Sequence, residues 1–161
     1  MKPVKLAARI ALSLGIAASA TAITMTTTSC KEQRANPFME SYGTKYDIPP
    51  FDKILYTDYL PAVEKGIADR KAEIEAIAEN PEEPTFDNTI MAMEKSGELL
   101  NRVMRVFGSL NEADGTPEIQ ELSETIFPMV SSASDEISMN PKLFARVKAL
   151  YDRRDSLGLE P

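Results

Sequence analysis

Acidic side chains are the residues of this chain whose type and spacing could bind a cation or move a proton. The 161-residue sequence carries 25 Asp and Glu against 18 Lys and Arg, and it contains no histidine. A catalytic zinc site most often takes two histidines and a carboxylate, and a serine-nucleophile site uses a histidine as its base. The sequence therefore excludes both arrangements within this chain, and we assign it no catalytic and no metal-binding residue.

Two acidic groupings remain as candidates for cation binding. Glu82 and Glu83 lie in a turn bracketed by two prolines, and a turn of this composition is typically solvated. The run Leu110 to Glu121 has Asp, Gly and Glu at the fifth, sixth and twelfth positions of a calcium loop. However, leucine at its first position has no side-chain oxygen, and a proline interrupts the run. We expect neither grouping to hold a metal ion.

The N-terminal residues have the pattern of an export signal. Lys2, Lys5 and Arg9 give a positive start, and the run Leu6 to Ile23 is mostly apolar. This run is short and is broken by serine and threonine, which favours an export signal over a membrane span.

Cys30 is the only cysteine, so it cannot form an internal disulfide. It follows small residues, as the lipidated cysteine of a lipoprotein does, and this predicts a signal peptide over residues 1–29 with lipid attachment at Cys30. The protein would then be exported and anchored in a membrane, on its periplasmic or surface side. The alternative is cleavage after Ala20, which would release a soluble periplasmic protein and leave Cys30 as a free thiol.

The charge of the chain restricts its partners. Removing residues 1–29, which hold three positive charges and no negative ones, changes the net charge from −7 to −10. Nucleic-acid binding needs clustered Lys and Arg, so a nucleic-acid partner is excluded. The same charge argues against electrostatic adhesion to anionic lipid. The length allows one domain.

Residues 30–56, the lead-in, are predicted to be a tether followed by extended chain. Pro37, Pro49 and Pro50 disfavour regular structure, and Gly43 lies between them. The aromatic residues of this segment indicate that it packs against the rest of the protein.

A helix is predicted from Thr57 or Asp58, either of which can cap it, to Asn80. A second begins at the cap Thr85 and continues through Gly97, where a close helix crossing or simple tolerance would explain the glycine. Their apolar stripes are Leu60, Val63, Ile67, Ile74 and Ile77, and Phe86, Ile90, Met93, Leu100, Val103 and Phe107.

Two further helices begin at Thr116-Pro117 and Asn140-Pro141, each a cap followed by proline in the first turn. Pro128 is expected to bend or break the first of them. We expect the second to bury Leu143, Phe144, Val147 and Leu150, and Arg102, Arg105, Arg153 and Arg154 to lie on exposed helix faces. With no strand-like alternation, the fold is predicted to be all-α, and a glycine stop followed by Pro161 is typical of a truncated chain.

Several motifs in order carry a resemblance to a known family. They are Asn36-Pro37-Phe38, Pro49-Pro50-Phe51-Asp52-Lys53-Ile54, Tyr59-Leu60-Pro61-Ala62, the run Ala76 to Ile90, Glu94-Lys95-Ser96-Gly97, Asn140-Pro141-Lys142-Leu143-Phe144-Ala145-Arg146-Val147 and Tyr151-Asp152. From Asn36 onward the chain resembles the N-terminal region of the thimet oligopeptidase family, and within it bacterial peptidyl-dipeptidases. No catalytic or zinc-binding residue of the family falls on the matching positions.

The resemblance implies antiparallel helices that form part of a larger, two-lobed helical zinc peptidase with a deep channel for short peptides. Residues 57–161 would be its helical N-terminal region, contributing channel wall, with the zinc held elsewhere in the complete enzyme. The alternative hypothesis is a stand-alone helical lipoprotein that binds peptides or a partner protein without catalysis.

Overall fold

The computed structural model describes residues 34–158. The predicted signal peptide and Cys30 lie outside these residues. The described chain contains the helices α1 (Tyr59–Ala78), α2 (Ala92–Lys95), α3 (Glu98–Ala113), α4 (Pro117–Ser138) and α5 (Pro141–Asp152). Short 3-10 turns precede α1 and follow α5, a π-helical turn precedes α2, and the described residues contain no strand. The prediction of an all-α fold is confirmed.

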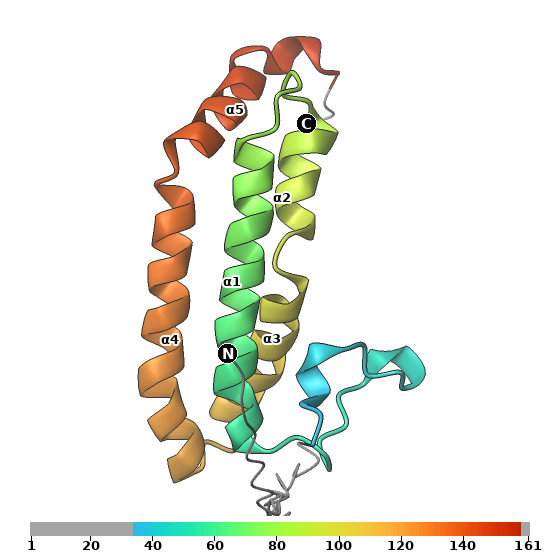
Figure 1. Ribbon diagram of the computed structural model, residues 1–161, viewed down its shortest axis with the longest axis vertical. Helices are drawn as coiled ribbons and strands as arrows, with labels where there is room; N and C mark the ends of the chain where they lie inside the picture. The colour runs from blue at the N-terminus through green and yellow to red at the C-terminus, as the bar shows by residue number, and fades with distance from the viewer. Residues whose placement is uncertain (1–33, 159–161) are drawn as a thin grey trace, which may run out of the picture. The chain divides into compact units, whose positions relative to one another are not determined.

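The helix α1 is the central element of residues 34–158. It contacts α3, α4 and α5, and α2 and α3 together run back along it in the opposite direction (Figure 1). The helix α4 then runs in the direction of α1, and α5 follows it past the far end of α1. Helices that follow one another, α1 and α2–α3 and then α3 and α4, are therefore antiparallel, as predicted, whereas α1 and α4 run in the same direction.

The core consists of two clusters along α1. The larger joins α1 to α3, α4 and the lead-in, and its buried residues are Phe38, Tyr59, Ala62, Val63, Leu100, Val103, Val106, Phe107, Ile119 and Ile126. The smaller joins the end of α1 to α5 through Ile74, Ile77, Ala78 and Leu143. These clusters contain most of the predicted apolar stripes.

The predicted stripes were wrong at Phe86 and Phe144, which are exposed. Phe144 is 63% exposed, because the buried face of α5 is formed by Leu143, Arg146 and Leu150. Position 144 is adjacent to Leu143 in sequence and is rotated by about 100° from it around the helix. Arg146 therefore lies on the buried face of α5, where the apolar spacing had predicted Phe144.

The predicted second helix is interrupted at Ser96–Gly97. Thr85 caps its start as expected, accepting a hydrogen bond from the Asn88 amide at 3.1 Å, and a π-helical turn (Phe86–Met91) leads into α2. Gly97 then has φ +74°, a left-handed conformation that glycine adopts without strain. Its amide donates to the Glu73 carboxylate at 2.7 Å. Gly97 thus ends a helix instead of lying within one.

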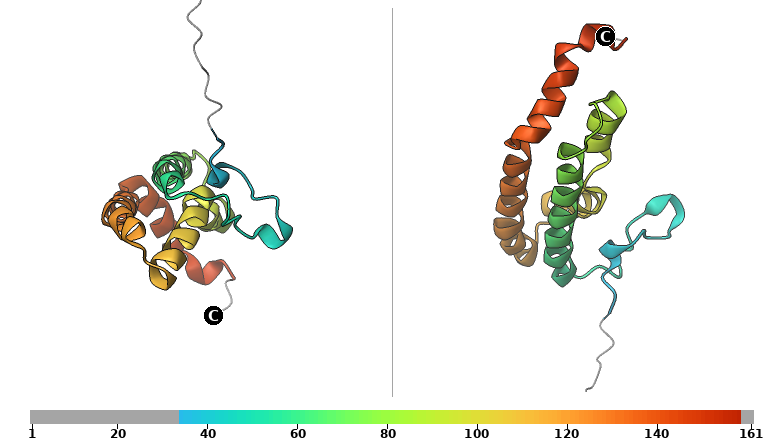
Figure 2. Two further views of the ribbon diagram at one scale, coloured as in Figure 1. Left: turned by 90° about the horizontal axis from the view of Figure 1, so that it is seen from below. Right: turned by 45° about the horizontal axis from the view of Figure 1, so that its top comes forward.

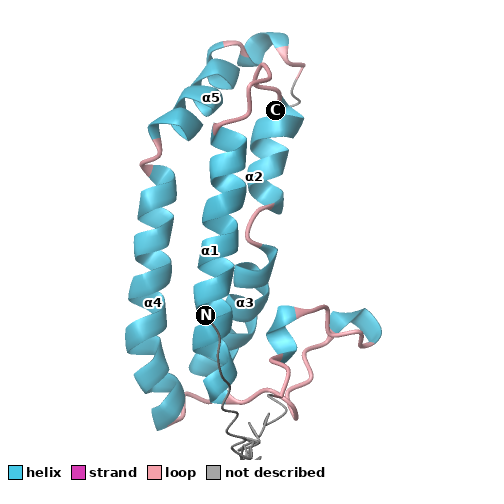
Figure 3. Ribbon diagram, in the orientation of Figure 1, coloured by secondary structure: helices cyan, strands magenta, loops and turns pink. Residues whose placement is uncertain are grey.

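The expected break at Pro128 does not occur, and α4 is one uninterrupted helix from Pro117 to Ser138 (Figure 3). A proline removes the backbone hydrogen bond to the carbonyl four residues earlier, here that of Glu124. Both Pro128 and Glu124 are exposed, so water can reach the face of the helix where this bond is lost.

No helix within residues 34–158 has both the length and the apolar character needed to cross a bilayer.

Candidate functional site

The described residues do not supply a zinc site. No group of three or more His, Cys, Asp or Glu side chains within residues 34–158 is arranged to hold a metal ion. The sequence also has no histidine, the ligand that catalytic zinc sites use most. The donor chemistry present here therefore does not fit the zinc that the family resemblance implies, and any such metal must be bound by other residues.

The run Leu110 to Glu121 covers the end of α3, the short connection 114–116 and the start of α4. Asp114 caps the end of α3 and is exposed, while Thr116 caps α4 by accepting a hydrogen bond from the Ile119 amide at 3.4 Å. The side chain of Gln120 donates to the Gly115 carbonyl at 2.7 Å. These residues serve a helix–helix turn.

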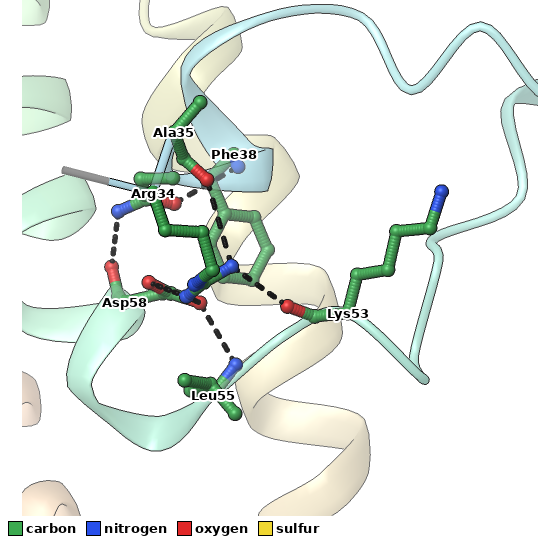
Figure 4. A network of polar contacts seen from close by, with 7 residues as sticks. Arg34, Ala35, Phe38, Lys53, Leu55 and Asp58 are labelled. Carbon is green, nitrogen blue, oxygen red and sulfur yellow. Dashed lines mark hydrogen bonds and ion pairs between the residues drawn. The ribbon is translucent and has the colours of Figure 1, made fainter. Parts of the chain in front are cut away.

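A paired arginine and carboxylate hold the lead-in at the start of α1 (Figure 4). Nη2 of Arg34 lies 2.5 Å from both carboxylate oxygens of the buried Asp58, and its Nη1 donates to the Lys53 carbonyl at 2.9 Å. The Asp58 carboxylate also accepts from the Leu55 amide at 2.8 Å, and Asn36 donates to the Asp58 carbonyl at 2.8 Å. Charge-assisted bonds of this kind are stronger than neutral ones. Asp58 is the N-cap residue of α1, one of the two predicted, but its side chain makes no cap hydrogen bond and fastens the lead-in instead.

Aromatic side chains continue this attachment into the core. The ring centroids of Phe38 and Tyr59 are 5.1 Å apart, those of Tyr59 and Phe107 are 5.3 Å apart, and those of Phe107 and Phe127 are 5.6 Å apart. Burial raises the pKa of Tyr59 to about 12, with smaller contributions from Tyr42 and Asp58. The first part of the lead-in thus packs against the helices through Phe38, as predicted, whereas Tyr46, Phe51 and Tyr56 farther along it are exposed.

Arg102 of α3 makes a second attachment. It donates to the Glu40 carbonyl, lies 5.8 Å from the Tyr42 ring centroid, and has a side chain that is only 16% exposed. The prediction of an exposed face is wrong for Arg102 and holds for Arg105, which is exposed. Beside them is an open hollow of about 250 Å³ lined by Tyr42, Asp47, Pro49, Glu98, Arg102, Arg105 and Val106. Its two carboxylates balance its two guanidinium groups, so it has no net charge to select an ion.

The proline-bracketed turn, residues 80–85, is held by a buried arginine that sequence reasoning missed. Arg146 of α5 is 7% exposed. Its Nη1 donates to the Asn80 and Glu82 carbonyls at 2.7 and 3.0 Å, and its Nη2 donates to the Asn88 side chain at 2.9 Å and to the Thr89 hydroxyl at 3.3 Å. The sequence could have predicted the burial of Arg146, because its spacing from Leu143 and Leu150 places it on the same apolar helix face.

Arg153 binds the same turn from the end of α5. It donates to the Glu83 carboxylate and to the Pro84 carbonyl. The prediction that Arg153 lies on an exposed helix face is therefore wrong. Glu82 and Glu83 are both exposed, which agrees with the predicted solvated turn, and the Glu83 carboxylate also pairs with Arg153. Three of the six acceptors are backbone carbonyls and the other three are side chains of the turn and of the residues after it, so Arg146 and Arg153 position the chain.

The described residues therefore form a framework of helices with loops fixed on them. Comparison with known proteins shows to which family the chain belongs. No protein-family model matches the chain. It is 44% identical over 125 residues to the dipeptidyl carboxypeptidase of Escherichia coli (strain K12), covering 78% of this chain and 18% of that relative. The Salmonella typhimurium dipeptidyl carboxypeptidase is 40% identical over 125 residues, with the same coverage of both chains.

A more distant relative is the oligopeptidase A of Escherichia coli, 29% identical over 112 residues, which are 70% of this chain and 16% of the relative. The chain thus spans less than a fifth of the length of the curated relatives it matches. The resemblance carried by its motifs is confirmed: the chain belongs to the peptidase family of thimet oligopeptidase, oligopeptidase A and dipeptidyl carboxypeptidase.

Proposed function

We propose that this chain forms the N-terminal, channel-wall part of an exported zinc metallopeptidase that cleaves short peptides, of the peptidyl-dipeptidase type. The observation that carries the proposal is the 44% identity to a dipeptidyl carboxypeptidase over 125 residues. The chain alone is catalytically incompetent in this proposal, because it contains no histidine to bind zinc or to act as a base.

The polar residues of the structure fit a framework role. The side chains Arg34, Arg102, Arg146 and Arg153 each bind backbone carbonyls of a loop, and each fixes that loop on a helix. Positioning of this kind suits a channel wall, which must keep one shape while peptides pass. In the proposal the zinc and the residues that bind it belong to the part of the enzyme outside the matched segment.

The proposed location follows from the N-terminal sequence pattern. Residues 1–29 direct export, and lipid attachment at Cys30 anchors the protein in a membrane on its periplasmic or surface side; cleavage after Ala20 would make it soluble and periplasmic instead. Mass spectrometry of the mature N-terminus distinguishes the two, because only the first gives an acylated peptide that begins at Cys30.

A stand-alone helical lipoprotein that binds peptides or a partner protein is the second candidate. One observation favours it: Phe38, Val63, Val103, Phe107 and Ile126 have no exposed surface within this chain alone. Residues 34–158 thus bury a core of their own, as an independently folded module does.

An immunoblot of cells of the source organism, using antibody raised to residues 58–150, separates the candidates. The peptidase proposal predicts a band several times heavier than the 17.8 kDa of this chain, together with chelator-sensitive release of dipeptides from peptide C-termini by the immunopurified protein. A single band at the mass of this chain, without that activity, would favour the binding module.

A further inference from the structure

The far part of the lead-in, residues 45–56, exposes large apolar side chains. We name this segment the lead-in tip. Tyr46 is 82% exposed, Ile48 and Phe51 are each 54% exposed, and Leu55 and Tyr56 are also exposed. In both views of Figure 2 the chain around residues 45–50 lies away from the helices. Single exposed apolar residues are ordinary, but Tyr46, Ile48 and Phe51 are exposed within six residues of one another, and such a concentration favours a partner.

The lead-in tip is held in a defined conformation. Tyr46 and Asp47 have φ of +63° and +52°, left-handed values that are uncommon for residues other than glycine. The Asp47 carboxylate accepts from the Tyr42 amide at 3.2 Å and from the Ser41 hydroxyl at 3.3 Å. The Thr44 hydroxyl donates to the Ile48 carbonyl at 2.6 Å. The apolar side chains therefore project from a turn with its own hydrogen bonds.

The base of the lead-in is fixed at both of its ends. Arg34 and Asp58 join its first described residue to the start of α1, and Arg102 holds the Glu40 carbonyl on α3. Phe38, between these two attachments, is fully buried. The lead-in tip consequently keeps its place on the protein, and a partner can bind it without ordering the chain first.

The charge and the relatives of the chain indicate which partner covers this surface. Within residues 45–56, Lys45 and Lys53 balance Asp47 and Asp52, and the whole chain carries a net charge of −7. An anionic membrane or a nucleic acid therefore gains no electrostatic attraction here. An apolar protein surface suits these side chains better.

The relatives are much longer than the matched segment, so they contain further protein that offers such a surface. Only 36 of the 161 residues lie outside the 125-residue match, so the matched segment must contain residues 37–125 and with them the lead-in tip. That segment is 18% of the length of dipeptidyl carboxypeptidase, and the rest of such a polypeptide lies outside it. The relatives thus carry this segment together with a much longer chain.

We propose that the lead-in tip is a docking surface for the remaining part of a peptidase polypeptide of this family, on the same or on a separate chain. The inference rests on the proposed function and adds where the contact is made. Tyr46, Ile48 and Phe51 would be covered by apolar side chains of that remaining part.

Site-specific photocrosslinking in cells of the source organism tests the inference. The full-length protein carries p-benzoylphenylalanine in place of Tyr46, of Phe144 on α5, or of Lys148, which is exposed on α5 and pairs with Asp152. Crosslinked peptides are identified by mass spectrometry. We expect position 46 to give crosslinks to peptidase-family sequence outside the matched segment, in several-fold higher yield than position 148.

Crosslinks from position 46 to lipid, to a second copy of the matched segment, to an unrelated protein or to nothing would overturn the inference. Position 144 separates this failure from failure of the proposed function. If position 144 reaches peptidase-family sequence and position 46 does not, the family polypeptide is present and the docking surface is wrong. If neither position reaches it and the immunoblot shows only a band at the mass of this chain, the proposed function fails as well.

Discussion

Gly66 of α1 lies directly against the backbone of Leu100 in α3. A Cβ atom added at position 66 would be 2.8 Å from the Leu100 nitrogen and 2.9 Å from its Cα. Real Cβ atoms do not approach backbone this closely, so any larger residue would force α1 and α3 apart. The close helix crossing considered for Gly97 is thus found at Gly66.

Replacing Gly66 with alanine is expected to destabilise the protein. Alanine favours a helix by about 1 kcal/mol over glycine, but overpacking against backbone costs roughly 1–3 kcal/mol and disturbs the neighbouring core. We expect a net loss in the free energy of unfolding, measured by urea denaturation. Gly108→Ala is the matched control, because Gly108 is in α3 and a Cβ there meets nothing within 4 Å. It should stabilise by about 0.5–1 kcal/mol, and equal behaviour of the two variants would refute the close approach.

Arg146→Met should loosen the proline-bracketed turn. The substitution keeps an apolar side chain on the buried face of α5 but removes the donor that binds the Asn80 and Glu82 carbonyls and the Thr89 hydroxyl, whereas the Asn88 side chain still accepts from the Thr85 amide. Each buried unsatisfied group costs about 1–3 kcal/mol, so we expect a loss of at least about 2 kcal/mol in the free energy of unfolding.

Hydrogen exchange measures the local part of this effect. Amides of residues 80–89 should exchange faster in Arg146→Met, while those in the middle of α3 change little. Lys148→Met, an exposed substitution on the same helix, should alter stability by no more than about 0.5 kcal/mol. Unchanged exchange in the turn would show that Arg146 does not hold it.

Asp58→Ala should release the lead-in from α1. It removes the buried partner of Arg34 and the acceptor of the Leu55 amide, whereas Asp58→Asn keeps one side-chain oxygen. We expect Ala to destabilise by about 1–3 kcal/mol and Asn by less. Limited trypsin digestion should cut after Lys45 or Lys53 faster in the alanine variant than in Asp52→Asn, where the changed side chain is exposed. Equal digestion rates would contradict this attachment.

The stability of the protein should fall at alkaline pH partly because of Tyr59. Burial raises the pKa of its phenol from 10.0 to about 12. Between these values the unfolded chain loses this proton before the folded protein does, so the contribution present below pH 10 is lost as pH rises toward 12. Tyr59→Phe should therefore show a shallower decline over this range, measured by urea denaturation at several pH values.

The same substitution has a clear expectation at neutral pH. The Tyr59 hydroxyl is buried and has no hydrogen-bond partner within residues 34–158. Removing it leaves no group unpaired, so Tyr59→Phe should be neutral or stabilising at pH 7. A large loss of stability there would indicate a partner for the hydroxyl, such as a buried water.

The candidate site could be predicted from the sequence only in part. The absence of histidine is a property of composition, and composition alone excludes histidine-based zinc and serine-type catalysis within this chain. The family was also accessible, because its motifs are contiguous runs. Arg34, Arg102 and Arg146 could not be given roles in this way, since their partners lie 24, 62 and up to 66 residues away.

What the sequence alone determined are the features that depend on neighbouring residues. Thr85, Thr116 and Asn140 each cap a helix by accepting from amides of its first turn, and the periodic apolar residues mark the faces that α1 and α3 bury. Only the tertiary structure decided the outcome at Gly66, Gly97 and Pro128. The contact between Gly66 and Leu100 and the turn at Gly97 require two segments side by side, and tolerance of Pro128 depends on which face of α4 meets water. Local chemistry sets where helices begin, whereas packing between distant segments sets where they touch, break or continue.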